Sequence, residues 1–275
     1  MDNDSTTHRT PDSPIGDIAY LTRSEHRVPA LVALTERPRS RSELCELTGV
    51  SSSTIRRTLN EFEDRLWIRK DSHQYVTTRL GEAIASGAKD MIDRVETERK
   101  LRHVWHWLPD EVSEFPVETW SELTVTVAEP EAPYRPVNRF ESLLEETNEL
   151  RFVRPEIAMM EPCLDLLRQL IDDGVDVVLV DRPHSHTYFR STYPEHSSEM
   201  MQQDNFTVLE HDNLPSYGIG ILEERVAISC YEQDSGTVYA LIDTDAPAVC
   251  EWAQSVYETY TAAAQPVDAR QTSAE

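Results

Sequence analysis

Apolar residues recur at helical spacing through the first third of the chain and predict three helices. The first spans about Ile15–Thr35 and is interrupted near Thr22–Ser24. The second is short. Ser40 followed three residues later by Glu43 is typical of a capping box, and Gly49 supplies a residue that can end a helix in the left-handed conformation.

The third predicted helix is the most amphipathic one. Ser51 or Ser52 caps it, and it ends near Leu66. At 100° per residue its apolar side chains form one inward stripe, which comprises Ile55, Leu59, Phe62 and Leu66. Two helices joined by a tight turn at Gly49 predict a helix-turn-helix.

The pattern then changes from helical to alternating. Residues 67–77 predict a strand, a tip at Lys70–His73 and a second strand, which together are typical of a wing. A long helix is expected from Thr78 to Leu108, before Pro109. The apolar side chains of this helix form a stripe that is too long for the small winged domain to cover. They are Ile84, Met91, Ile92, Val95, Leu101, Val104 and Trp105.

Beyond Pro109, strands and helices alternate. The segment Val175–Val180 is apolar at almost every position, which is typical of a strand buried on both faces. We therefore expect an α/β domain whose sheet is covered by helices. The expected strands are 123–128, 150–154, 175–180, 206–209, 219–222, 227–231 and 237–242, and the expected helices are 138–147, 162–173, within 185–203, and 246–264.

The polar face of the third helix carries side chains that suit DNA. Arginine can bond guanine through two hydrogen bonds, asparagine suits adenine, and serine reaches bases or phosphates. The free amides of a helix N-terminus also attract phosphate. We predict that double-stranded DNA is contacted by Ser51, Ser52, Ser53, Thr54, Arg56, Arg57 and Asn60 of the helix, and by Arg69, Lys70 and His73 of the wing.

The charge of the chain at first opposes this prediction. The net charge is −24, from 26 basic and 50 acidic residues. Residues 37–79, however, hold nine basic against six acidic side chains, a local charge of +3. Only three of the 26 basic residues are lysines, and an acid-rich, lysine-poor composition indicates a halophilic protein. In molar salt the Debye length falls to about 3 Å, so distant acids do not repel DNA.

The sequence contains no motif for several other functions. No run of residues is apolar enough to cross a bilayer, and Met1–Pro14 lacks the apolar core of a signal peptide, so a cytoplasmic protein without a membrane partner is expected. The four cysteines form no C-x-x-C pair, and no nucleotide-binding or hydrolase motif is present. We expect no metal, no cofactor and no enzymatic activity. Cys45 lies inside the helix-turn-helix, either as a buried thiol or as a redox switch.

A second candidate site follows the apolar strand Val175–Val180, because ligands of open sheets bind beyond the carboxyl ends of strands. This segment and the end of the preceding strand offer cationic and aromatic groups for an anionic metabolite: Arg154, Arg182, His184, Tyr188 and Arg190. His184 and His186 also have a spacing that can hold a metal, although a polar surface loop is the simpler interpretation.

The segment from Arg37 to Ile68, followed by the wing and by "TTRLGEAI", resembles archaeal winged-helix regulators of the ArsR/MarR type, especially haloarchaeal ones. The resemblance continues through "VWHWLP" (Val104–Pro109) and "DTDAPAVCEWAQSVYETY" (Asp243–Tyr260). It implies a C-terminal domain similar to the middle domain of a methanogenesis filament regulator, dimeric DNA binding, and a phospholipase-D-like fold. The His-x-Lys motif of that fold is absent from this chain.

These observations predict a homodimeric, DNA-binding transcription regulator. The N-terminal winged helix-turn-helix reads DNA, and the C-terminal domain senses a small effector or dimerises. Two alternatives stay open: a winged helix that docks onto transcription machinery, and an enzyme in the C-terminal domain. The expected organisation is a disordered tail at 1–14, the winged helix at 15–80, a dimerisation helix at 81–108, the α/β domain at 110–264 and a disordered tail at 265–275.

Overall fold

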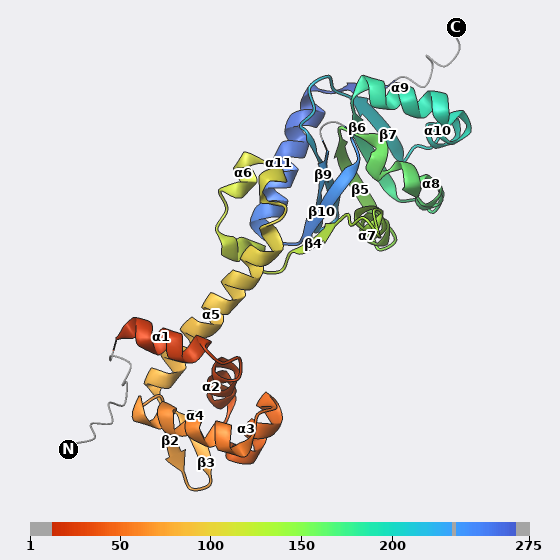
Figure 1. Ribbon diagram of the computed structural model, residues 1–275. Coiled ribbons are helices and arrows are strands. Elements are labelled where there is room, and N and C mark those ends of the chain that lie inside the picture. Colours follow the sequence, from red (N-terminus) through yellow and green to blue (C-terminus); the bar gives the residue numbers. More distant parts are fainter. Residues whose placement is uncertain (1–12, 233–234, 268–275) are drawn as a thin grey trace, which may run out of the picture. The chain divides into compact units, whose positions relative to one another are not determined.

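The computed structural model describes residues 13–232 and 235–267 (Figure 1). The chain forms two compact units, residues 1–95 and 96–275, and the boundary falls within one long helix, α5 (Arg79–Leu101). Within the described residues, no helix combines the length and the apolar character that crossing a bilayer requires.

The N-terminal unit is mainly helical. Its other elements are α1 (Pro14–Thr22), α2 (Arg27–Glu36), β1 (Arg39–Ser40), α3 (Arg41–Thr48), α4 (Ser52–Asp64), β2 (Ile68–Asp71) and β3 (Gln74–Thr77). The three strands form an antiparallel sheet in the order β1-β3-β2. The sheet therefore consists of the predicted hairpin and the two-residue strand β1, which the sequence analysis did not predict.

One apolar core holds this unit together. It contains Leu31, Leu34, Leu44, Ile55, Leu59, Phe62 and Trp67, among others. The Tyr20 ring packs edge-on against Phe62, and the Arg27 and Arg65 guanidinium groups lie about 4 Å from its centroid. The core thus fixes α4 on its apolar side and leaves its other side exposed.

The C-terminal unit is built on an eight-stranded sheet. Its elements are η1 (Trp105–Trp107), α6 (Asp110–Ser113), η2 (Val117–Trp120), β4 (Thr124–Val127), α7 (Arg135–Leu144), β5 (Glu149–Arg154), η3 (Ile157–Met159), η4 (Glu161–Cys163), α8 (Leu164–Asp172), β6 (Asp176–Asp181), α9 (Pro183–Thr192), α10 (Pro194–Met200), β7 (Phe206–Glu210), β8 (Tyr217–Leu222), β9 (Arg225–Tyr231), β10 (Val238–Thr244), α11 (Pro247–Ala263) and β11 (Gln265–Pro266).

The strand order is β11-β7-β6-β5-β8-β9-β10-β4, with β5, β6 and β7 parallel and the remaining pairs antiparallel. Side chains alternate between the two faces. Leu150 and Phe152 pack into a core under α7 and α8, whereas Val153 packs into a second core with α11 (Figure 1). The expected α/β domain, with helices on both faces of the sheet, is present.

The structure corrects several expectations. The long helix ends at Leu101, not Leu108, because residues 102–104 form turns and residues 105–107 a 3₁₀ helix. Leu66, placed on the inward stripe of α4, follows that helix with φ of 60° and is 65% exposed. The predicted loop and helix within 185–203 is two helices, α9 and α10.

Residues at the inner ends of both predicted tails belong to ordered elements. Ser13 caps α1 by accepting a hydrogen bond from the Gly16 N–H at 3.0 Å. At the other end, β11 pairs with β7, and the Val267 N–H donates to the Val208 carbonyl at 3.1 Å. The rest of the predicted tails, residues 1–12 and 268–275, lies outside the described residues.

Candidate functional site

The turn between α3 and α4 is built by side-chain caps. The Ser40 N–H donates to Glu43 at 2.8 Å, and the Glu43 N–H donates to the Ser40 hydroxyl at 3.3 Å, which is the predicted capping box. Gly49 ends α3 with φ of 69°, a conformation that suits glycine. Ser51 then caps α4 through the Thr54 N–H. These local bonds set the direction in which α4 leaves the turn.

The same cap makes a prediction about pH. The Ser40 N–H and the Arg37 guanidinium lower the pKa of the Glu43 carboxyl from 4.5 to about 2. Because the folded pKa lies below the unfolded one, the cap contributes fully above pH 4.5 and is lost as the pH falls toward 2. Carbon-13 NMR of the Glu43 carboxyl should show this low midpoint, and Arg37→Gln should raise it. An ordinary midpoint in the folded wild type would contradict the capping box.

One face of α4 is exposed and cationic. Ser52, Ser53, Arg56, Arg57 and Asn60 are all exposed, and the opposite face is buried through Ile55, Thr58, Leu59 and Phe62. Among the described residues, neither Arg56 nor Arg57 has an ion pair. Both arginines are therefore free to bind an external anion or base.

The acidic end of α4 is chemically different. Arg65 donates to Asp17 at 2.9 Å and to Glu61 at 2.7 Å. These contacts neutralise Arg65 within the molecule and leave the cationic character of α4 at its N-terminal half. The residues of α4 that are predicted to contact DNA therefore lie before Arg65, where neither Arg56 nor Arg57 has an ion pair among the described residues.

The hairpin β2–β3 brings further cations close to the start of α4. Ser52, Lys70 and His73 line a hollow of about 510 Å³, and its remaining lining residues are Ser40, Arg41, Ser42, Cys45 and Tyr75. None of these described lining residues is an aspartate or glutamate. Arg69 is exposed and lies 3.7 Å from Asp71, so it is partly neutralised. Hydroxyl and cationic groups without carboxylates suit a phosphate.

Arg41 and Ser42 belong to this hollow and were missing from the predicted site. Both are exposed at the first turn of α3. The available signal was their position directly after the cap Ser40, where free amides attract anions. Sequence spacing alone did not show that this turn of α3 lies beside the hairpin.

Cys45 lines the same hollow. It is half-buried and packs against the core of the N-terminal unit. The expected packing of the Cys45 thiol against the core is seen, although the side chain is only partly buried. Whether oxidation of Cys45 changes α4 stays a hypothesis, and labelling of the folded protein with a thiol reagent tests it.

The second predicted site is not one open crevice. Arg154 is 2% exposed and donates to Asp181 at 2.8 and 2.5 Å. Arg182 donates to Glu156 at 3.0 Å and to the carbonyls of Leu214 and Pro215. The Tyr188 hydroxyl donates to Glu161 at 3.0 Å. These three side chains already have carboxylate partners within the molecule, which are Asp181, Glu156 and Glu161.

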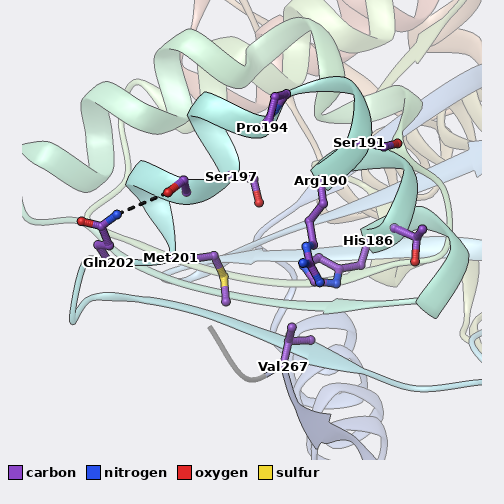
Figure 2. A pocket seen from close by; sticks show the side chains of 10 residues that line it. His186, Arg190, Ser191, Pro194, Ser197, Met201, Gln202 and Val267 are labelled. Carbon is purple, nitrogen blue, oxygen red and sulfur yellow. Dashed lines mark hydrogen bonds between the residues drawn. The ribbon is translucent and has the colours of Figure 1, made fainter. Parts of the chain in front are cut away.

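The histidines of this segment lie apart. His184 is exposed on α9, whereas His186 is buried. Within the described residues, no group of three or more His, Cys, Asp or Glu side chains can hold a metal ion. Of the predicted effector residues, Arg190 lines a pocket of about 530 Å³ between α9, α10 and Val267 (Figure 2).

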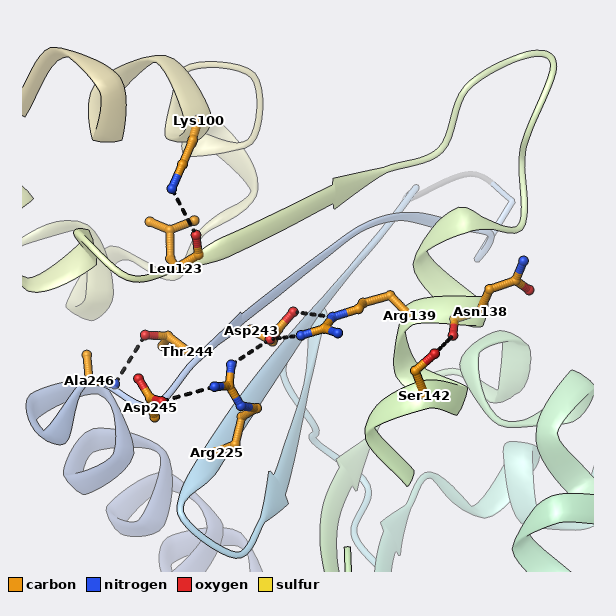
Figure 3. A network of polar contacts seen from close by, with 10 residues as sticks. All are labelled: Lys100, Leu123, Asn138, Arg139, Ser142, Arg225, Asp243, Thr244, Asp245 and Ala246. Carbon is orange, nitrogen blue, oxygen red and sulfur yellow. Dashed lines mark hydrogen bonds and ion pairs between the residues drawn. The ribbon is translucent and has the colours of Figure 1, made fainter. Parts of the chain in front are cut away.

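A separate polar cluster is structural. Asp243 on β10 is fully buried and accepts hydrogen bonds from Arg139 of α7, at 2.9 and 2.7 Å, and from Arg225 of β9, at 2.8 Å (Figure 3). Arg225 also donates to Asp245 at 3.0 Å. The cluster ties α7 to the antiparallel half of the sheet, and it uses the two aspartates of the "DTD" segment.

The aromatic residues near Pro109 also pack rather than bind. Trp120 is fully buried, and the Trp107 ring stacks on Tyr239 with centroids 4.9 Å apart. Both belong to the core that α11 covers. Trp105, by contrast, is 39% exposed.

Two families match the chain. The family described as HVO_A0261 N-terminal domain matches residues 15–100, and that of the methanogenesis regulatory protein FilR1, middle domain, matches residues 133–263. No curated protein matches. The two matched segments correspond to the helix-turn-helix with its hairpin and to most of the α/β unit.

Similar solved structures are distant. The archaeal chromatin protein TrmBL2 is 13% identical, with a TM-score of 0.42, over 91% of this chain and 98% of that one. NucT from Helicobacter pylori is 11% identical, with a TM-score of 0.43, over 53% and 99%. A transcriptional regulator of the IclR family from Rhodococcus sp. is 14% identical, with a TM-score of 0.19, over 93% and 96%. Similarities this weak carry no conclusion about function.

Proposed function

We propose that this protein is a DNA-binding transcriptional regulator. The proposal agrees with the match of residues 15–100 to the HVO_A0261 N-terminal domain and of residues 133–263 to the middle domain of a regulatory protein. The observation that carries the proposal is the exposed, unpaired face of α4 beside a cationic hollow that lacks carboxylates. Both features lie within residues 37–79, where nine basic residues outnumber six acidic ones in an otherwise acidic chain.

In the proposed complex, α4 enters the major groove with its N-terminal half. Arg57 and Asn60 reach base edges, because arginine and asparagine can each form two hydrogen bonds with a purine. Ser52, Arg41 and Lys70, which line the hollow, hold phosphates and fix the register without reading sequence. The hairpin β2–β3 is the wing that follows the neighbouring backbone.

The acidic remainder of the protein fits this function under one condition. At a net charge of −24, long-range repulsion from DNA is strong in dilute buffer. Molar salt screens charges beyond about 3 Å but leaves direct contacts in place. We therefore propose that the protein binds DNA at high salt, as a halophilic archaeal regulator.

The direct test is selection of genomic fragments by the purified full chain in molar potassium chloride. A regulator retains a reproducible set of fragments that share a sequence, and these compete better than random DNA. If no fragment is retained above random DNA, the proposed function is wrong. The same protein should then be tested against transcription machinery, which is the docking alternative.

We further propose that the regulator is a homodimer. Apolar side chains on α1 and α5 are exposed, including Ile18 at 56%, Met91 at 60% and Val95 at 47%. Ile18 and Met91 line a largely apolar hollow of about 690 Å³ between these helices. An exposed apolar surface of this kind indicates an interface, and a second copy would place two α4 helices one DNA turn, about 34 Å, apart.

Met91→Glu should convert the dimer into a monomer, because it places an unpaired charge inside the proposed interface. Light scattering after gel filtration in molar potassium chloride measures the mass, and the dimer dissociation constant should rise at least about tenfold. Ser86→Glu is the control, since Ser86 is an exposed polar residue of the same helix. A wild-type monomer, or a dimeric Met91→Glu variant, would contradict the dimer.

The C-terminal unit is proposed to regulate rather than to catalyse. Its phospholipase-D-like fold stays a prediction, and the chain has no His-x-Lys motif. A small effector is proposed for this unit.

A further inference from the structure

The pocket between α9, α10 and Val267 is a second hollow whose described lining holds no carboxylate. Its volume is about 530 Å³, and its polar lining includes Arg190, His186 and Ser197. None of the described lining residues is an aspartate or glutamate, although acidic residues outnumber basic ones 50 to 26 in the whole sequence. Arg190 is therefore a cationic group in a lining without carboxylates, in a protein that is negative as a whole.

Arg190 supplies the positive charge. It lies on α9, four positions after His186, and both side chains line the pocket (Figure 2). Among the described residues, Arg190 has no ion pair and no side-chain hydrogen bond. This contrasts with Arg154 and Arg182 of the same region, which have carboxylate partners. A partly buried guanidinium without a partner is a binding group for an oxyanion.

His186 supplies an independent observation. The residue is 3% exposed, and its Nδ1 lies 2.9 Å from Glu210 Oε1. A carboxylate only accepts hydrogen bonds, so Nδ1 carries the hydrogen. The Nε2 atom is buried and has no hydrogen-bond partner within the described residues. An unpartnered buried nitrogen in a pocket wall costs free energy unless a ligand or water satisfies it.

We infer that this pocket binds a small oxyanion, a carboxylate or phosphate group, through Arg190 and His186. The guanidinium donates two parallel hydrogen bonds to the anion. The imidazole of His186, held at Nδ1 by Glu210 of β7, offers its buried, unpartnered Nε2 to the anion as a second contact. The Ser197 hydroxyl lines the same wall. The role of this anion as an effector rests on the proposed regulatory function, whereas the binding itself does not.

The test is calorimetric titration of the full chain, without DNA, in molar potassium chloride. One arm uses inorganic phosphate and the other succinate, which distinguishes a phosphate from a carboxylate ligand. Saturable binding with one site per chain is expected for at least one anion. Arg190→Gln should weaken it about tenfold or more, because a charge-assisted contact is lost.

Arg168→Gln is the matched control, since Arg168 on α8 is exposed, pairs with Glu199 and does not line the pocket. It should bind as the wild type does. His186→Gln should also weaken binding, and circular dichroism shows whether each variant is folded. If neither anion binds saturably, or if a folded Arg190→Gln keeps wild-type affinity, the inference is wrong. Loss of DNA binding in the fragment selection would leave this result unaffected.

Discussion

Arg57→Ala should weaken binding to the selected operator about 5- to 100-fold. The expected reason is the loss of two hydrogen bonds to a guanine, and such a pair is worth about 1–3 kcal/mol of discrimination. Arg57 is exposed and has no ion pair among the described residues, so its removal breaks no internal ion pair that the structure describes. The affinity lost should depend on sequence: the variant should discriminate less between the operator and a copy altered at one base pair.

Fluorescence anisotropy with labelled operator in molar potassium chloride measures this effect. Arg102→Ala is the control, because it removes the same exposed arginine type from a surface pair with Glu98, outside the proposed interface. Lys70→Gln provides the contrast. As a phosphate contact of the wing, Lys70 should contribute equally to all sequences, and its loss should reduce the salt dependence of binding by about one ion.

The same measurement distinguishes the docking alternative. An Arg57→Ala variant with wild-type affinity and specificity for the operator would show that α4 does not read bases. If the operator is bound through other surfaces, α4 is then available for a protein partner. Equal losses in Arg57→Ala and Arg102→Ala would indicate a nonspecific charge effect instead.

Much of the N-terminal unit is predictable from its sequence because its signals are local. The capping box at Ser40 and Glu43, the left-handed Gly49 and the cap Ser51 each act within one helical turn, and all three are present. The stripe of α4 is correct up to Phe62 and wrong at Leu66. Leu66 fits the helical spacing, but the helix stops before it to turn the chain into β2.

The contacts between distant segments were not predictable in the same way. The strand β1 has two residues and exists because Arg39 and Ser40 pair with the hairpin. The ion pair of Arg154 joins residues 27 positions apart, on adjacent parallel strands. Register between strands decides such pairs, and a single sequence does not show it. Arg154 and Arg182 therefore suggested a ligand site, where the structure has internal partners.

The residues of the proposed anion site could not be identified from a single sequence either. His186 has a buried Nε2 without a partner, and Arg190 has no ion pair among the described residues, whereas Arg154 and Arg182 have carboxylate partners. Partner availability depends on where every nearby carboxylate lies, and residue type does not report it. Sequence reasoning pointed to the segment Arg182–Tyr193, which contains both residues of the proposed anion site, and could not rank the residues within it.

The largest loss of stability is expected from breaking the Arg154–Asp181 pair. Both side chains are buried, at 2% and 0% exposure, and two hydrogen bonds join them at the carboxyl ends of β5 and β6. Asp181→Ala leaves the Arg154 charge buried without its partner, which should cost about 3–5 kcal/mol of the free energy of unfolding. Denaturant unfolding in molar potassium chloride, followed by tryptophan fluorescence, measures it, since Trp107, Trp120 and Trp252 pack in this unit.

The loss of stability in Asp181→Ala should be compared with the losses in two other variants. Arg168→Met breaks the exposed pair with Glu199 and should cost less than about 1 kcal/mol. The double variant Arg154→Met, Asp181→Leu removes both charges together and should recover much of the loss, because paired apolar replacements are often nearly neutral. A small effect of Asp181→Ala would mean that Arg154 finds another partner or reaches solvent. The strand ends would then be open enough to bind a ligand, as the sequence alone suggested.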